Sequence, residues 1–181
     1  MKKLSYTLII FAFAVCFFLP AAAQDKSDKK FKPDSGKTAL KYAAEGSAFF
    51  LKGDYQRAIK PYQKAVDLEK GQPTLEKNIW RVVVDNLGMA YGITGDLKKA
   101  KETLEYGLSK DPDYPMFHYN LACTYAEMKD EDQAITYLRN AFKNKENMIE
   151  GEEIPDPSAD DSFARFMKSE KFLSALKELE Q

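Results

Sequence analysis

The sequence predicts an all-α protein built from stacked pairs of helices. Three observations lead to this fold class: a fixed period, small and aromatic residues at helical spacing within each period, and Gly-Asp pairs between helices. Five residues recur 34 positions later, in the pairs Leu87/Leu121, Tyr91/Tyr125, Asp96/Asp130, Ala100/Ala134 and Leu104/Leu138. A repeat of this length is typical of stacked helical units that bury a continuous core.

A first repeat begins near Ala39 and follows the same pattern. Its matches to the second repeat are Gly46/Gly88, Phe49/Tyr91, Gly53/Gly95, Asp54/Asp96, Ala58/Ala100, Tyr62/Leu104 and Ala65/Gly107. Glycine takes the left-handed conformation that ends one helix, and the aspartate after it caps the amides that start the next. Pro61 falls inside the second helix of this pair, where it removes one hydrogen bond and should bend the helix.

An insertion separates the first two repeats. Their Gly-Asp turns lie 42 residues apart, so eight extra residues fall around 70–79. Thr74 is expected to cap the helix that follows. The run from Ile79 to Val84 continues the helical spacing. Because it contains three consecutive valines, a buried strand remains an alternative for these residues. Trp80, within this run, is expected in the core or as a cover over the neighbouring helix pair.

The third repeat should form helices at about 115–128 and 131–144. Residues 146–161 are acidic and contain proline, and we expect a solvated loop because the acid spacing of a calcium-binding loop is missing. Residues 162–181 carry apolar side chains at helical spacing, with Asp161 and Ser169 as suitable caps. These C-terminal helices are predicted to cover the apolar face that the last repeat exposes.

The second repeat also matches a known residue pattern. The pattern W-x2-L-G-x2-Y, then A-x3-F, then P is met by Leu87, Gly88, Tyr91, Ala100 and Pro112, with Leu104 in place of the aromatic residue. The sequence therefore resembles the tetratricopeptide repeat family. The resemblance implies a right-handed superhelix of three helix pairs in residues 37–145, with repeats at about 39–72, 81–114 and 115–148.

The resemblance further implies that the first helix of each pair lines a concave groove for a peptide or protein segment. The expected groove residues are Phe50, Asn86, Met89, Met116, Tyr119, Asn120 and Cys123. One subgroup of the family holds a terminal carboxylate with lysine, arginine and asparagine at set groove positions. Only the asparagines, Asn86 and Asn120, are present here, so this sequence does not predict binding of a terminal carboxylate.

The N-terminal residues have the pattern that is typical of an export signal. Lys2 and Lys3 precede an apolar run, and three alanines end it, so residues 1–23 are predicted to be a signal peptide cleaved after Ala23. The run is also just long enough to be an uncleaved membrane anchor. Residues 24–36 are polar and charged and are expected to be a flexible linker. The predicted location is periplasmic or secreted, with an N-terminal membrane anchor as the alternative.

The residues that usually carry chemistry are scarce. One histidine and two cysteines, one of them in the predicted signal, cannot build a usual zinc site, and no phosphate-binding loop or nucleophile motif occurs. His118 is expected to pack between helices. With a formal net charge of −1, the chain lacks the positive charge that nucleic acid requires. We therefore expect neither an enzyme nor a bound cofactor, metal, small-molecule substrate or nucleic acid.

These observations favour a scaffold whose partner is a protein or peptide, with membrane contact only if the signal is uncleaved. Two alternatives stay open from the sequence. One is a structural module that assembles with itself through its convex surfaces and Trp80. The other is a non-catalytic accessory subunit of an envelope enzyme complex.

Overall fold

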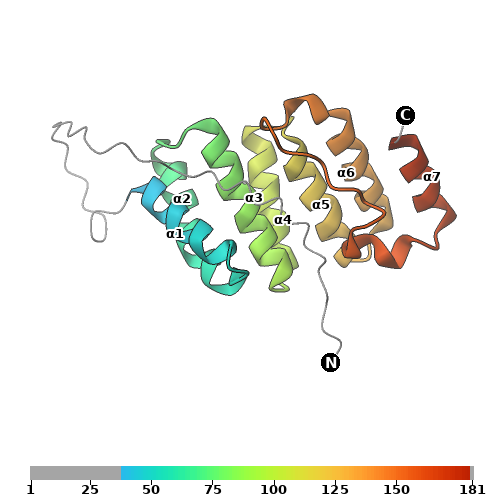
Figure 1. The fold of residues 1–181 in the computed structure, drawn as a ribbon, viewed down its shortest axis with the longest axis horizontal. Helices are drawn as coiled ribbons and strands as arrows, with labels where there is room; N and C mark the ends of the chain where they lie inside the picture. Colours follow the sequence, from blue (N-terminus) through green and yellow to red (C-terminus); the bar gives the residue numbers. More distant parts are fainter. Residues whose placement is uncertain (1–37, 180–181) are drawn as a thin grey trace.

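The computed structural model describes residues 38–179, and over this range helices are the only regular secondary structure (Figure 1). Its elements are α1 Ala39–Phe50, α2 Tyr55–Gly71, α3 Lys77–Ile93, α4 Leu97–Lys110, α5 Pro115–Glu127, α6 Glu131–Lys143, the 3-10 turns η2 Lys145–Asn147 and η3 Asp161–Phe166, and α7 Glu170–Leu179. The predicted all-α class is confirmed. The strand alternative at 79–84 is wrong, because these residues lie inside α3.

The predicted signal peptide, residues 1–23, and the predicted linker, residues 24–36, lie outside the described residues. None of the helices between residues 38 and 179 has both the length and the apolar character needed to cross a membrane.

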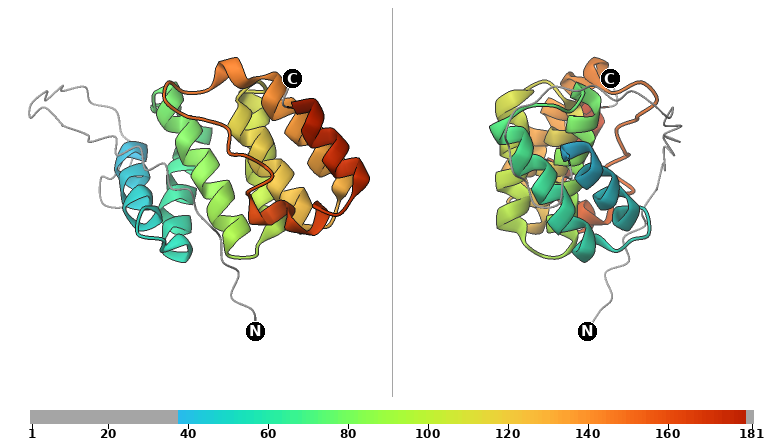
Figure 2. Two further views of the ribbon diagram at one scale, coloured as in Figure 1. Left: turned by 45° about the vertical axis from the view of Figure 1, so that its right-hand side comes forward. Right: turned by 90° about the vertical axis from the view of Figure 1, so that its left-hand side faces the viewer.

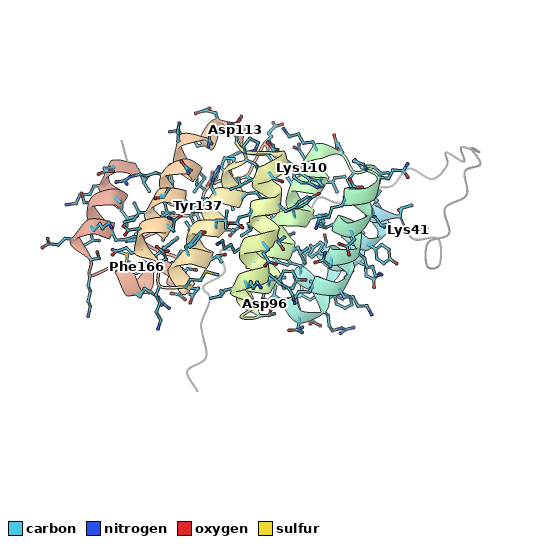
Figure 3. All side chains as sticks on the ribbon, turned by 180° about the vertical axis from the view of Figure 1, so that it is seen from behind. Lys41, Asp96, Lys110, Asp113, Tyr137 and Phe166 are labelled. Carbon is cyan, nitrogen blue, oxygen red and sulfur yellow. The ribbon has the colours of Figure 1, made fainter. Side chains whose placement is uncertain are left out.

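The helices stack as three pairs, α1 with α2, α3 with α4 and α5 with α6. The first helices also contact one another in sequence, α1 with α3 and α3 with α5, so they form one continuous surface, here called the first-helix face. Figure 2 shows the stack from two further directions. Figure 3 shows the stack from behind the view of Figure 1, with Tyr137 of α6 labelled.

The turn inside each pair repeats in detail. Residues 53, 95 and 129 all have positive φ, with values of 73° for Gly53, 90° for Gly95 and 68° for Lys129. The aspartate that follows each of them accepts a hydrogen bond from a backbone amide three residues later. The third turn therefore keeps the geometry of the other two with a lysine where they have glycine.

The two helices of a pair cross very closely because glycine lies at the crossing. A Cβ atom on Gly46 would lie 2.5 Å from the ring of Tyr62, and one on Gly88 would lie 2.7 Å from the side chain of Leu104. The third pair has alanine at the corresponding position, Ala122, which is fully buried. Ring and leucine side chains thus pack directly on the backbone of the facing helix in the first two pairs.

The connection between α2 and α3 differs from the prediction. Thr74 does not cap α3, which begins three residues later at Lys77. Its backbone amide and hydroxyl instead donate hydrogen bonds to the buried carboxylate of Glu69 at the end of α2. This bond closes the insertion onto α2. Pro61 does not interrupt α2, which is continuous from Tyr55 to Gly71.

The C-terminal residues cover the last pair. Phe163 of η3 and Phe172 of α7 are fully buried and stack with ring centroids 5.5 Å apart, in one core cluster with residues of α5 and α6. Ser169 accepts a hydrogen bond from the Phe172 amide, as a cap of α7. The cap of η3 is Asp160, one residue before the predicted Asp161, because its carboxylate reaches the amide of Ser162.

Lys129 gives the first test of this fold. We expect Lys129→Gly to raise the free energy of unfolding by about 1 kcal/mol, because a side chain in the left-handed conformation costs roughly 1–2 kcal/mol. Urea denaturation measures the change. The reverse substitution at the equivalent turn, Gly95→Ala, should lower stability by a similar amount. Unchanged or reduced stability of Lys129→Gly would show that the turn is not under this constraint.

Gly88 gives the second test. Gly88→Ala should lower the free energy of unfolding by about 1–3 kcal/mol, because the added methyl group overlaps Leu104. Gly92→Ala is the matched control in the same helix, since its Cβ would meet Ala100 at an ordinary 3.8 Å. The control should be neutral or slightly stabilising, as alanine favours helix over glycine. Equal losses for both variants would argue against a close crossing at Gly88.

Candidate protein-binding face

A cavity of about 170 Å³ lies on the first-helix face between α3 and α5. Five of the seven predicted groove residues line it, namely Met89, Met116, Tyr119, Asn120 and Cys123. Other parts of its wall come from Ile93 and Leu97 and from residues 155, 156 and 159–162 beyond the last repeat. The helical spacing of the repeats brings these five side chains to one place.

The other two predicted residues lie nearer to α1. The ring of Phe50 packs edge-on against Tyr55 and Tyr62, with centroids 5.1 and 6.2 Å away. The amide of Asn86 donates a hydrogen bond to the Tyr62 hydroxyl at 3.1 Å, and that hydroxyl donates to Ser47 at 3.0 Å. Phe50 and Asn86 therefore belong to the contact between the first two pairs and do not line the cavity.

Residues 148–160, here called the groove segment, run along the first-helix face beside the cavity (Figures 1 and 2). The predicted loop is present, without helix or strand, but part of it packs on the stack and is not solvated. Pro157 is buried, and Ile149 and Ile154 are half-buried and pack against the two core clusters of the stack. The segment thus bridges the two clusters instead of extending into solvent.

Two tyrosine hydroxyls of the third pair hold the groove segment. The Tyr114 hydroxyl donates to Glu152 at 2.8 Å, and the Tyr119 hydroxyl donates to Asp160 at 2.9 Å. The Cys123 thiol lies 3.7 Å from the same Asp160 oxygen. Tyr119 is only 2% exposed, so the predicted groove contact of this residue is made with the chain's own segment.

A buried ion pair fixes the start of α3 and the approach to the segment. Arg81 donates to Asp111 at 2.7 Å and to the backbone carbonyl of Asn147 at 3.3 Å, and its guanidinium lies over the Tyr114 ring. Burial acts to raise the pKa of Asp111, but the hydrogen bonds and charges of Arg81 and Lys77 outweigh it, and the net shift is downward. Arg81 is therefore paired directly with Asp111, and it acts on Glu152 only through its charge, which opposes the rise in the pKa of Glu152.

A second buried carboxylate, Asp85, lies beneath this face. Asn120 is 8% exposed and donates its side-chain amide to Asp85 at 2.7 Å, so this predicted groove amide is already engaged. Burial raises the pKa of Asp85 to about 7, the hydrogen bond from Asn120 opposes the shift, and the charge of Glu152 adds to it. Burial also raises the pKa of Glu152.

The remaining chemistry-bearing residues pack within the fold. His118 is buried, its Nε2 lies 2.7 Å from the carbonyl oxygen of Pro112, and burial lowers its pKa. Burial raises the pKa of the Cys123 thiol well above its usual value, which disfavours the reactive thiolate. Trp80 packs edge-on against Tyr106 and Phe117. Within residues 38–179, no group of three metal-ligating side chains is placed to hold an ion.

Sequence reasoning missed Tyr114, Glu152 and Asp160. Tyr114 precedes the first helix of its pair and so falls outside the helical pattern used to select groove residues. Glu152 and Asp160 lie in an aperiodic stretch, where nothing in the spacing identifies the residues that face the helices. The only sequence feature that marked this stretch was the acidic composition of residues 146–161, which predicted a solvated loop.

Asp85 makes stability depend on pH. Its folded-state pKa lies above its unfolded value, so its favourable contribution is complete below about pH 4 and is lost as pH rises through about 7. We expect Asp85→Asn, which keeps an acceptor for Asn120, to raise the melting temperature at pH 8. Near pH 4 the two proteins should melt at similar temperatures. A constant difference between the two proteins across this pH range would contradict the shifted pKa.

Comparison with known families agrees with this architecture. Two sequence models of the tetratricopeptide repeat match the chain, one over residues 42–72 and 84–114 and the other over residues 103–136. The second match starts within α4 and ends within α6, so it joins the second and third helix pairs. No curated protein matches the chain. These matches show tetratricopeptide repeats within residues 42–136, and the all-helical fold agrees with the helical superhelix that such repeats form.

Proposed function

We propose that this protein is a non-catalytic scaffold that holds a segment of another protein against its first-helix face. Tetratricopeptide repeats generally mediate interactions between proteins. The observation that carries the proposal is the cavity between α3 and α5, where five residues selected from the sequence converge on one apolar depression.

The cavity suits one large apolar side chain of the partner. A cavity of roughly 150 Å³ with apolar walls takes up a benzene-sized group, and this one measures about 170 Å³. Met89 and Met116 stand on two of its sides. Methionine is unbranched and polarizable, so it adapts to side chains of different shape. A partner would therefore be anchored by an apolar residue, with the surrounding polar groups fixing its direction.

We place this scaffold in the cell envelope. The support is the sequence of residues 1–23, with two lysines, an apolar run and a small-residue cleavage site. In this proposal the partner is another envelope protein. The alternative of a structural module that assembles with itself through Trp80 has less support, because the Trp80 ring packs within the chain against Tyr106 and Phe117.

Met89 is the most direct probe of the proposal. Met89→Lys introduces a charge into the cavity wall and should reduce capture of the partner from an envelope fraction at least tenfold. Met89 is half-buried on the cavity wall, so the melting temperature should change little. Tyr119 and Asn120 are poor probes, since changing them also disturbs Asp160 and Asp85.

Met128→Lys is the matched control, because Met128 is 37% exposed and lies outside the cavity wall. The control should capture the partner as the parent does. Equal capture by Met89→Lys and the parent would place binding on another surface. Light scattering that shows only self-assembly, with no captured partner, would favour the structural alternative.

A further inference from the structure

The groove segment occupies the part of the first-helix face where the proposed partner would bind. Its sequence, MIEGEEIPDPSAD, contains acidic residues and two prolines and has no basic residue. It runs beside α5 without helix or strand structure, and it forms one wall of the cavity. The chain therefore already shows what kind of segment this surface accepts.

We propose that residues 148–160 are an internal ligand of the first-helix face, and that the partner supplies an extended acidic segment that displaces them. This inference rests on the proposed function and specifies the chemistry of its partner. The partner segment would carry two carboxylates about eight residues apart, as Glu152 and Asp160 are, with apolar residues or prolines between them.

The contacts of the groove segment define two carboxylate subsites. The first is the Tyr114 hydroxyl, which donates to Glu152. The second is the Tyr119 hydroxyl, with the Cys123 thiol beside it, and both face the same oxygen of Asp160. Hydrogen bonds to a charged acceptor are stronger than neutral ones. Carboxylates held at these two hydroxyls fix the position and direction of the segment.

The apolar contacts lie between and around these subsites. Ile149 packs against the cluster formed by the first pairs, and Ile154 packs against the cluster of the third pair. Pro157, three residues before Asp160 in the chain, is buried. Proline lacks a backbone donor and favours extended conformations, so it suits a segment bound by its side chains.

The groove segment is held in a way that permits exchange. The hydrogen bonds from its backbone amides to backbone carbonyls are local, from Met148 to Lys145, from Glu152 to Ile149 and from Ala159 to Asp156. Side chains make the contacts with α5, while Glu150, Glu153 and Ser158 are exposed. A tethered segment competes at an effective concentration on the order of millimolar. A partner must overcome this competition, which lowers its apparent affinity until the segment is released.

A cysteine at position 160 would make this competition controllable. In the full chain carrying Cys16→Ser and Asp160→Cys, the new thiol lies close to Cys123, since the Cys123 sulfur is 3.7 Å from an Asp160 oxygen. Oxidation should lock the segment in place by a disulfide. In the reduced form the segment lacks both the disulfide and the Asp160 carboxylate that accepts a hydrogen bond from Tyr119. The probe is a fluorescently labelled peptide of residues 148–160 with the parent sequence.

Fluorescence anisotropy should show the peptide binding at least tenfold more tightly to the reduced form than to the oxidised form. A peptide with Gln at position 152 and Asn at position 160 should bind at least tenfold more weakly. Tyr114→Phe and Tyr119→Phe, added to the reduced form, should each reduce binding. Equal binding of the peptide to both redox states, or binding to neither, would overturn the proposal.

A second variant covers failure of the cysteine protein to fold or to form its disulfide. Glu152→Gln with Asp160→Asn weakens both anchors, and the melting curve reports whether the stack is intact. This protein should bind the labelled peptide at least tenfold more tightly than the parent does. Absence of that gain in a folded double variant also overturns the proposal.

Partner capture separates the two proposals. Equal capture by the oxidised and reduced forms, together with loss in Met89→Lys, would reject the internal ligand and keep the scaffold function. A second outcome is also possible, in which peptide binding depends on the redox state but Met89→Lys weakens the capture of no partner. That outcome would keep the internal ligand and reject the scaffold function.

Discussion

The absence of a side chain at two helix crossings sets the geometry of the whole stack. Tyr62 and Leu104 lie directly on the backbone of Gly46 and Gly88, where a Cβ atom would overlap them. This brings the two helices close together in the first pair and in the second. The Tyr62 hydroxyl then reaches Ser47 and Asn86, so the crossing in the first pair also joins α1 to α3. The shape of the first-helix face follows from these contacts.

The two ends of that face differ in their electrostatics. Neutral hydroxyl and amide groups join α1 to α3, whereas the region of α3 and α5 contains the carboxylates Asp85, Glu152 and Asp160. The guanidinium nearest to them, Arg81, is paired with Asp111. Burying carboxylates without cations is costly, and groups with raised pKa values often mark functional sites. The α3–α5 region is therefore the part of the face whose charges are least well compensated.

Periodicity explains what the sequence could predict. The crossing residues and the Gly-Asp turns recur at a fixed spacing because each pair solves the same packing problem, so the helices and the shared position of Met89, Met116 and Cys123 follow from the pattern. The groove segment has no period, and its docking depends on tertiary contacts with Tyr114 and Tyr119. Caps depend on single-residue register, which explains why Asp160 takes the place expected for Asp161.

The groove segment is held by a small number of contacts. Two hydroxyl–carboxylate hydrogen bonds contribute roughly 1.5–3 kcal/mol each at most, and the half-buried Ile149 and Ile154 add about 1 kcal/mol each. Against these stand the desolvation of Glu152 and its repulsion of Asp85, both of which disappear when the segment leaves. The free energy of local opening in proteins ranges from near zero up to the free energy of global unfolding. We expect a segment balanced in this way to open at lower cost than the helix pairs beneath it, so the proposed exchange would not require the stack to unfold.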